Sequence, residues 1–108
     1  MTYCIRVVLL AYNEADSIAS VIIRLKEHLT NFQSSFRLYV VNDGSTDNTL
    51  SVVEQFSDEI PLTLLNHVTN MGVAQAFDTG LREAIKDSNS EDVIITMEAD
   101  GTSVPELV

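Results

Sequence analysis

Two kinds of hydrophobic pattern alternate along this chain. Short, mostly apolar runs over residues 5–11, 36–41, 62–65 and 92–97 predict four β-strands. Between these runs, apolar residues recur at the spacing of an amphipathic helix. The three predicted helical faces consist of Ile18, Val21, Ile22, Leu25 and Leu29, then Leu50, Val53 and Phe56, then Val73, Ala76, Phe77, Gly80, Leu81 and Ala84.

Local signals mark where the helices begin. Asn13 or Asp16 is expected to cap the first helix, and residues 45–47 (Ser-Thr-Asp) are expected to cap the second. Gly80 lies inside the third predicted helix, where glycine costs about 1 kcal/mol relative to alanine. We therefore predict that another element packs closely against Gly80.

The order β-α-β-α-β-α-β predicts an α/β fold. Strands joined by helical connections pair in parallel, with right-handed crossovers and helices on both faces of the sheet. A chain of 108 residues suits one domain of this kind. The expected architecture is therefore a Rossmann-like open parallel sheet.

Composition excludes several classes of function. The formal net charge of −10 argues against nucleic acid or an anionic membrane as a partner. A hydrophobic content of 45% is too high for a disordered chain. Cys4 is the only cysteine, so neither an internal disulfide nor a zinc cluster is expected. Because the sequence shows neither a long apolar span nor a signal peptide, we predict a cytoplasmic protein. This prediction is compatible with a longer parent chain that associates with the cytoplasmic face of a membrane.

Polar side chains follow each predicted strand at its carboxyl end. They are Tyr12, Asn13 and Glu14, then Asn42, Asp43, Gly44 and Ser45, then Asn66 and His67, then Glu98 and Asp100. The opposite ends of the strands carry ordinary turn residues, and ligands of open parallel sheets bind beyond the carboxyl ends. This asymmetry predicts a ligand site. Within it, we expect His67 to be an exposed loop residue and Met71, further along, to be an apolar plug.

Glu98 and Asp100 form an acidic pair at the end of the fourth strand. Two such carboxylates can bind Mg²⁺ or Mn²⁺, with phosphates and waters completing the coordination, although solvated turn carboxylates are the common alternative. The sequence has neither a Walker loop nor a G-x-G-x-x-G motif after the first strand. An anionic nucleotide bound to so acidic a chain would therefore need a divalent cation.

Four motifs together resemble the family 2 glycosyltransferases of GT-A fold. They lie at residues 8–14 (VLLAYNE), 40–49 (VVNDGSTDNT), 70–72 (NMG) and 97–102 (MEADGT), in order over nearly the whole chain. The nearest resemblance is to the dolichyl- and polyprenyl-phosphate sugar synthases. It implies transfer of a sugar from a UDP- or GDP-type donor to an acceptor, with a polyprenyl phosphate as one candidate.

The resemblance also implies roles for individual residues. The nucleotide-binding set would be Tyr12, Asn13, Glu14, Asp43, Asn70, Gly72 and Glu98, with Glu98 and Asp100 at the D-x-D positions that contact the metal. Asp43 would accept a hydrogen bond from a nucleobase N–H, and its alternative is an Asx turn before Gly44. For Tyr12, the alternative is packing over the first helix.

The chain departs from the family in two respects. Glu98 stands where the family usually has aspartate, and the chain ends soon after the D-x-D-like strand. We therefore expect residues 1–108 to be the nucleotide-sugar-binding half of a GT-A domain, without an assigned catalytic base and inactive alone. A non-catalytic half-domain that binds or assembles is the alternative, and a phosphoacceptor receiver domain is a weaker one. Self-association through an uncovered sheet edge is also expected.

Overall fold

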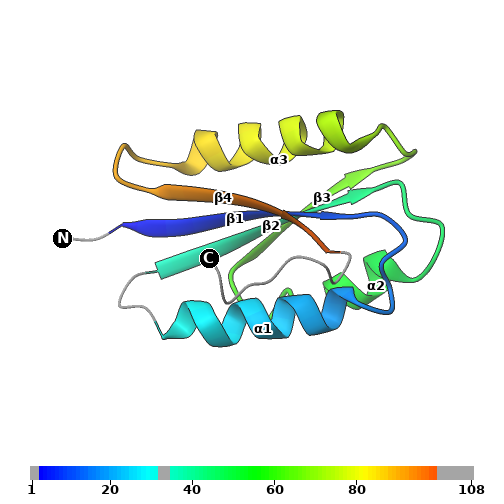
Figure 1. The fold of residues 1–108 in the computed structure, drawn as a ribbon, viewed down its shortest axis with the longest axis horizontal. Helices are drawn as coiled ribbons and strands as arrows, with labels where there is room; N and C mark the ends of the chain where they lie inside the picture. The colour runs from blue at the N-terminus through cyan, green and yellow to red at the C-terminus, as the bar shows by residue number, and fades with distance from the viewer. Residues whose placement is uncertain (1–2, 32–34, 100–108) are drawn as a thin grey trace.

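The computed structural model describes residues 3–31 and 35–99, which form a three-layer α/β fold (Figure 1). The strands are β1 (Cys4–Ala11), β2 (Ser35–Asp43), β3 (Leu62–His67) and β4 (Val93–Glu98). The helices are α1 (Ile18–Thr30), α2 (Thr49–Glu54) and α3 (Val73–Asp87). Helix α3 covers one face of the sheet, and α1 and α2 cover the other. The predicted element order and the predicted Rossmann-like class are both confirmed.

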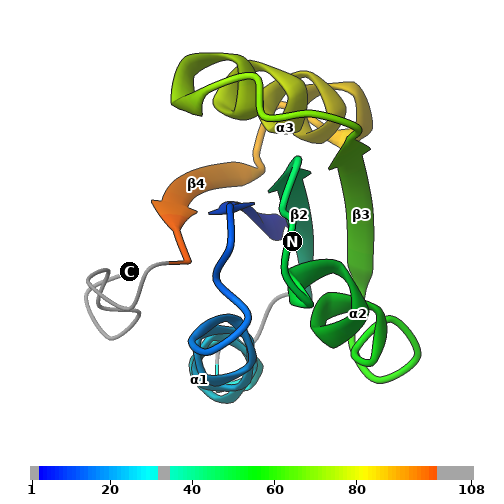
Figure 2. The same cartoon turned by 90° about the vertical axis from the view of Figure 1, so that its right-hand side faces the viewer.

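All strand pairs are parallel, in the order β3-β2-β1-β4. The register pairs Leu10 with Val41 of β2 and with Glu98 of β4. On the other side of β2, Asp43 pairs with His67. The carboxyl ends of the strands therefore meet at one edge of the sheet, which faces the viewer in Figure 2.

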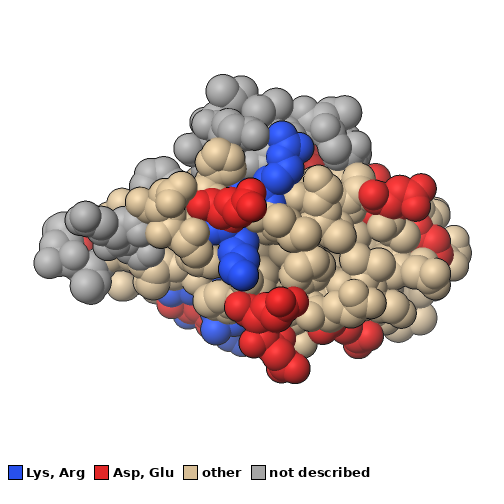
Figure 3. All heavy atoms as spheres, turned by 90° about the horizontal axis from the view of Figure 1, so that it is seen from below, with Lys and Arg blue, Asp and Glu red and all other residues tan. Residues whose placement is uncertain are grey.

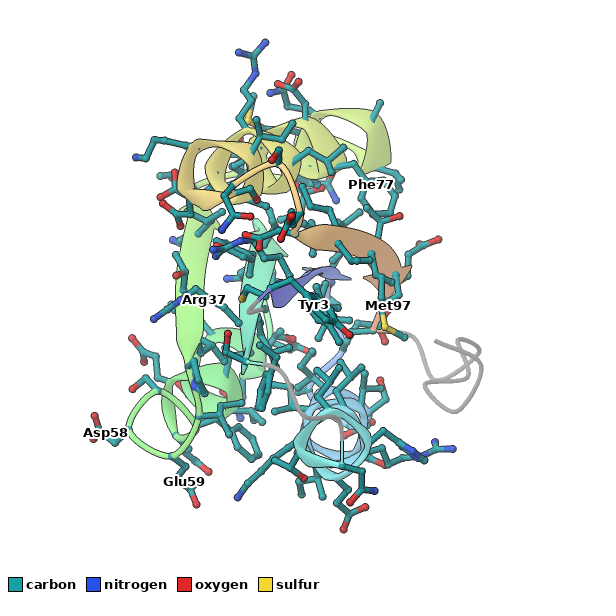
Figure 4. All side chains as sticks on the ribbon, turned by 90° about the vertical axis from the view of Figure 1, so that its left-hand side faces the viewer. Tyr3, Arg37, Asp58, Glu59, Phe77 and Met97 are labelled. Carbon is teal, nitrogen blue, oxygen red and sulfur yellow. The ribbon has the colours of Figure 1, made fainter. Side chains whose placement is uncertain are left out.

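Each face of the sheet buries its own apolar cluster. The predicted face of α1 (Ile18, Val21, Ile22, Leu25 and Leu29) is fully buried in the larger cluster, together with Val53 of α2. Helix α3 places Ala76 and Ala84 in the smaller cluster, with Phe77 packed against it. Met97 belongs to the larger cluster, so Phe77 and Met97 lie on opposite sides of the sheet (Figure 4).

Gly80 is the point at which α3 approaches the sheet. A Cβ atom at Gly80 would collide with Cγ1 of Val8 and would lie 3.0 Å from Cγ2 of Val41. The prediction of close packing at this glycine is therefore confirmed.

Helix α2 is shorter than its hydrophobic pattern. It ends at Glu54, and Phe56 lies in the following turn, where its backbone N–H donates to the carbonyl of Val53. The Phe56 ring still packs against the larger cluster. The face formed by α1 and α2 carries scattered acidic side chains and some basic ones among mostly uncharged residues (Figure 3).

The amino edge of the sheet, seen in Figure 4, carries more than ordinary turn chemistry. Arg6 donates from Nε to Asp92 at 2.9 Å and from Nη1 to the hydroxyl of Tyr39 at 2.6 Å. That hydroxyl donates in turn to the carboxylate of Asp87 at 2.9 Å. Tyr39 is fully buried, so this network joins both central strands to the end of α3 and the turn before β4.

Candidate functional site

A cavity of about 170 Å³ opens at the carboxyl edge of the sheet. Its lining comes from three strand ends and the start of α3: Leu10, Ala11, Tyr12, Glu14, Asp43, Val73, Glu98 and Ala99. Four residues of the predicted nucleotide-binding set, which come from three separate stretches of the sequence, therefore share one pocket. They are Tyr12, Glu14, Asp43 and Glu98.

Asp43 is the buried hub of this edge, with 4% of its surface exposed. Its Oδ1 accepts hydrogen bonds from the backbone N–H of Met71 at 2.9 Å and from Nδ1 of His67 at 2.8 Å. Its Oδ2 accepts the backbone N–H of Gly72 at 3.1 Å. Burial raises the pKa of the Asp43 carboxyl, but these three hydrogen bonds outweigh burial and hold the pKa below its usual value. The carboxylate form therefore persists at neutral pH.

Two expectations about the loop after β3 are wrong. His67 is not an exposed loop residue, because it is the last residue of β3 and its side chain is 11% exposed. Its Nε2 lies 2.9 Å from the hydroxyl of Thr79 in α3. Met71 is not a plug, because it is 55% exposed. The loop backbone faces Asp43 through the N–H groups of Met71 and Gly72.

Hydrogen bonds of Asn13 join the loop after β1 to the loop after β2. Asn13 adopts a positive φ of 51°, and its Oδ1 accepts backbone N–H groups from Thr46 at 2.8 Å and Asp47 at 3.3 Å. Its own N–H donates to Oγ of Ser45 at 2.9 Å. Asn13 and Asp16 therefore do not cap α1, whose N-cap residue is Ser17 without a side-chain capping bond. The Asn13 side chain fixes one rim of the cavity instead.

The start of α2 is stabilised by Asp47, one of the three residues that were expected to cap this helix. The N-cap residue is Asn48, which makes no side-chain capping bond, but Oδ1 of Asp47 accepts the backbone N–H of Thr49 at 2.9 Å. The Thr49 hydroxyl also accepts the N–H of Glu14 at 2.9 Å. Glu14 is thereby held at the mouth of the cavity by the start of α2.

Gly44 allows the β3–α3 loop to cross directly over the end of β2. It has a φ of +72°, and a Cβ there would collide with the backbone of Thr69 and Asn70. Asn70 in turn accepts the N–H of Gly72 on its Oδ1 at 3.0 Å. Asn70 and Gly72 therefore shape the loop that carries the Asp43 contacts, and neither lines the cavity.

Tyr12, Val73 and Glu98 are the exposed residues of the pocket. The Tyr12 ring is 44% exposed, and Glu98 is exposed at the end of β4. The position of Glu98 is fixed by the next residue, because Ala99 donates to the carbonyl of Leu10 at 2.8 Å and accepts Oγ of Ser17 at 2.7 Å. Asp100, the second predicted metal ligand, lies outside the described residues.

No group of three His, Cys, Asp or Glu residues within 3–31 and 35–99 is arranged to hold a metal ion. Over the same residues, no helix has the length and apolar character needed to cross a bilayer.

The fold is an open α/β sheet with a pocket beyond the carboxyl ends of its strands, which is where the ligands of such sheets bind. Residues 6–108 match the family described as glycosyl transferase family 2. The chain belongs to this family.

Relatives and solved structures agree with that membership. The chain is 29% identical over its whole length to an uncharacterized glycosyltransferase of Synechocystis and covers 33% of that protein. It is 30% identical over 86% of its length to a dolichyl-phosphate beta-glucosyltransferase of Trichomonas vaginalis, covering 28% of it. It is 24% identical over 98% of its length to an undecaprenyl-phosphate 4-deoxy-4-formamido-L-arabinose transferase of Pseudomonas fluorescens, covering 30% of it. The chain thus spans about a third of the length of these relatives.

Among solved structures, the crystal structure of Staphylococcus aureus TarS 1–349 superposes with a TM-score of 0.67 at 25% identity, over 93% of this chain and 28% of TarS 1–349. A Pyrobaculum calidifontis mannosyltransferase in complex with GDP-Man and Mn²⁺ superposes with a TM-score of 0.69 at 24% identity, again over 93% of this chain and 28% of the other. These likenesses confirm the GT-A glycosyltransferase fold.

Proposed function

We propose that this chain binds the nucleotide-sugar donor of a glycosyltransferase, and that the donor is of UDP or GDP type. The observation that carries the proposal is the single pocket shared by Tyr12, Glu14, Asp43 and Glu98. The half-exposed Tyr12 ring offers a stacking surface for a base. Glu14 and Glu98 supply acceptors for ribose hydroxyls at the mouth of the same pocket.

In this proposal, Asp43 selects the nucleobase by accepting a hydrogen bond from it. A carboxylate has about four acceptor positions, and protein donors fill three of those on Asp43. The remaining position, on Oδ2, can accept one more hydrogen bond. Uracil and guanine present an N–H on the ring edge that cytosine and adenine lack, so Asp43 favours UDP and GDP over CDP and ADP.

A divalent cation, Mg²⁺ or Mn²⁺, completes the proposed site. Glu98 and Asp100 would hold it together with the donor diphosphate, because carboxylates are the hard oxygen ligands that these ions prefer. The exposed carboxylate of Glu98 at the pocket fits this role, and the mannosyltransferase of the same fold was solved with Mn²⁺ and GDP-Man. When bound, the cation would neutralise charge on the departing nucleoside diphosphate.

The whole protein would transfer the sugar to an acceptor, for which a polyprenyl phosphate is the leading candidate. The names of the Pseudomonas and Trichomonas relatives, which act on undecaprenyl and dolichyl phosphates, support this acceptor class. We expect this chain alone to bind the donor without transferring the sugar, because no residue outside the donor motifs is assigned as a catalytic base.

The test is a binding titration of this chain with UDP, GDP, CDP and ADP, with and without Mn²⁺. A nucleotide at about 100 times its dissociation constant should raise the unfolding free energy by roughly 2.7 kcal/mol, which a thermal melt detects. Base stacking on an aromatic ring contributes roughly 1–3 kcal/mol, so Tyr12→Ala should weaken binding about fivefold or more.

Matched controls lie at the opposite edge of the sheet. Tyr3 precedes β1 and is 36% exposed, so Tyr3→Ala removes a similar ring away from the pocket (Figure 4). Glu98→Gln should reduce the effect of Mn²⁺, whereas Glu91→Gln, in the turn before β4, should not. If no nucleotide binds to a cooperatively melting chain, the proposal fails and a non-catalytic binding module takes its place.

A further inference from the structure

His67 connects three elements at the edge of the proposed donor pocket. It ends β3, and its ring lies between Asp43 at the end of β2 and Thr79 in α3. Nδ1 is 2.8 Å from Oδ1 of Asp43, and Nε2 is 2.9 Å from the Thr79 hydroxyl. Both ring nitrogens of a largely buried imidazole are therefore engaged.

The partners of His67 determine where its protons lie. A carboxylate only accepts hydrogen bonds, so Nδ1 carries a proton and donates it to Asp43. In the neutral ring, Nε2 then accepts the hydroxyl proton of Thr79. The Thr79 hydroxyl, which can donate or accept, engages Nε2 and so fixes the orientation of the ring toward Asp43.

His67 supplies the only side-chain donor to Asp43 among the described residues. The other two donors, the N–H groups of Met71 and Gly72, belong to the backbone of the following loop. The terminal torsion of aspartate is soft, so hydrogen bonds rather than rotamer preference decide how its carboxylate is turned. Without the His67 donor, only the N–H groups of Met71 and Gly72 hold the carboxylate, one on each oxygen, and the direction of its fourth acceptor position is less tightly fixed.

We propose that His67 is the positioning residue for base selection in the donor pocket. It holds the Asp43 carboxylate so that the remaining acceptor position on Oδ2 meets the N–H of uracil or guanine. This inference rests on the proposed function, and it assigns base selection to a pair of residues, His67 and Asp43. Thr79 supports the pair from α3.

Two amide substitutions separate the two contacts of His67. The amide nitrogen of asparagine occupies the position of Nδ1 along the side chain, so His67→Asn keeps a donor for Asp43 and loses the Thr79 contact. The amide of glutamine reaches as far as Nε2, so His67→Gln keeps the Thr79 contact and loses the donor to Asp43. His28 on α1 is the only other histidine of the chain, so His28→Gln is the control.

The experiment uses calorimetry to measure the dissociation constants of two nucleotides that differ in the N–H of the base ring. The pair is UDP and CDP, or GDP and ADP. A thermal melt of each variant without ligand reports whether it folds. A hydrogen bond to a charged group corresponds to a preference of about tenfold or more for UDP or GDP. In His67→Gln, this preference should fall to near unity while the affinity for CDP or ADP stays unchanged. His67→Asn and His28→Gln should keep the preference.

Each other outcome overturns the inference. If His67→Gln keeps the wild-type preference, or loses affinity for both nucleotides equally, His67 is only structural. If wild-type protein binds no nucleotide, the proposed function itself fails, which distinguishes the two failures. Should His67→Gln not fold, Thr79→Val decides the question: a reduced preference supports the inference, and an unchanged preference refutes it.

Discussion

Replacing Gly80 with alanine sets two known effects of opposite sign against each other. Alanine is favoured over glycine inside a helix by about 1 kcal/mol, so an exposed site would gain stability from the change. Gly80, however, is buried where α3 meets the sheet, and the added methyl group would collide with Cγ1 of Val8 and lie 3.0 Å from Cγ2 of Val41. The magnitudes decide the sign.

Overpacking a well-filled core typically costs 1–3 kcal/mol, and the cost is greatest where neighbours cannot move. Val8 is a β-branched residue in a central strand and is completely buried, so its side chain has no alternative position. We therefore take the upper part of this range and subtract the helical gain. Gly80→Ala should lower the free energy of unfolding by about 1–2 kcal/mol, or roughly 4–15 °C in Tm for a domain of this size.

Urea denaturation of Gly80→Ala, Val8→Ala and the double variant measures the collision directly. In the Val8→Ala background, the Cγ1 atom is gone, so Gly80→Ala should become neutral or stabilising. Gln75→Ala, at an exposed position of α3, reports helix propensity alone. If Gly80→Ala stabilises the wild-type chain, α3 does not pack on the sheet as described here.

Three further predictions concern the rest of the sheet. Tyr39→Phe removes the buried hydroxyl between Arg6 and Asp87, so it should lower the unfolding free energy in urea by about 1–3 kcal/mol without changing nucleotide affinity. The pKa of Asp43 is lowered in the folded state, so the contribution of its carboxylate to stability is complete above about pH 4. This contribution is lost as pH falls through the lowered pKa. Urea denaturation at decreasing pH should therefore show a smaller fall in unfolding free energy for Asp43→Asn than for the wild-type chain. In the described part of the chain, β4 pairs only with β1 and exposes Val93, so sedimentation velocity should show concentration-dependent self-association, whereas a monodisperse monomer would contradict it.

The elements of this fold are readable from the sequence because each has one clean hydrophobic period. All five predicted face residues of α1 are buried, and the apolar run of β1 is buried on both sides of the sheet. Helix α2 is the exception, since apolar spacing continues through Phe56 after the helix has ended at Glu54. A turn that follows a helix can still place a side chain in the core, and periodicity does not distinguish the two. Strand order is likewise absent from local patterns.

The pocket was predictable as far as one rule reaches, that polar residues at carboxyl strand ends converge. This rule brings Tyr12, Glu14, Asp43 and Glu98 together. It places His67 at the same edge but does not predict its burial or its partners, which depend on the β2–β3 register and on the position of α3. The pairing of Asp43 with His67 across two strand ends was the available signal, but its use requires knowing that the strands are neighbours. The hydrogen bonds of Asn13 were likewise not predictable, because they depend on how the loops after β1 and β2 pack against each other.

The strand order also bears on how a newly made chain reaches its native state. β1 is synthesised first but lies between β2 and β4, and its register with β4 joins Ile5 to Val93, near the far end of the described chain. During translation, one edge of β1 therefore stays unpaired until β4 has left the ribosome. Such long-range parallel pairing slows folding and prolongs the exposure of apolar surface. We expect the nascent chain to need chaperone protection until β4 has emerged.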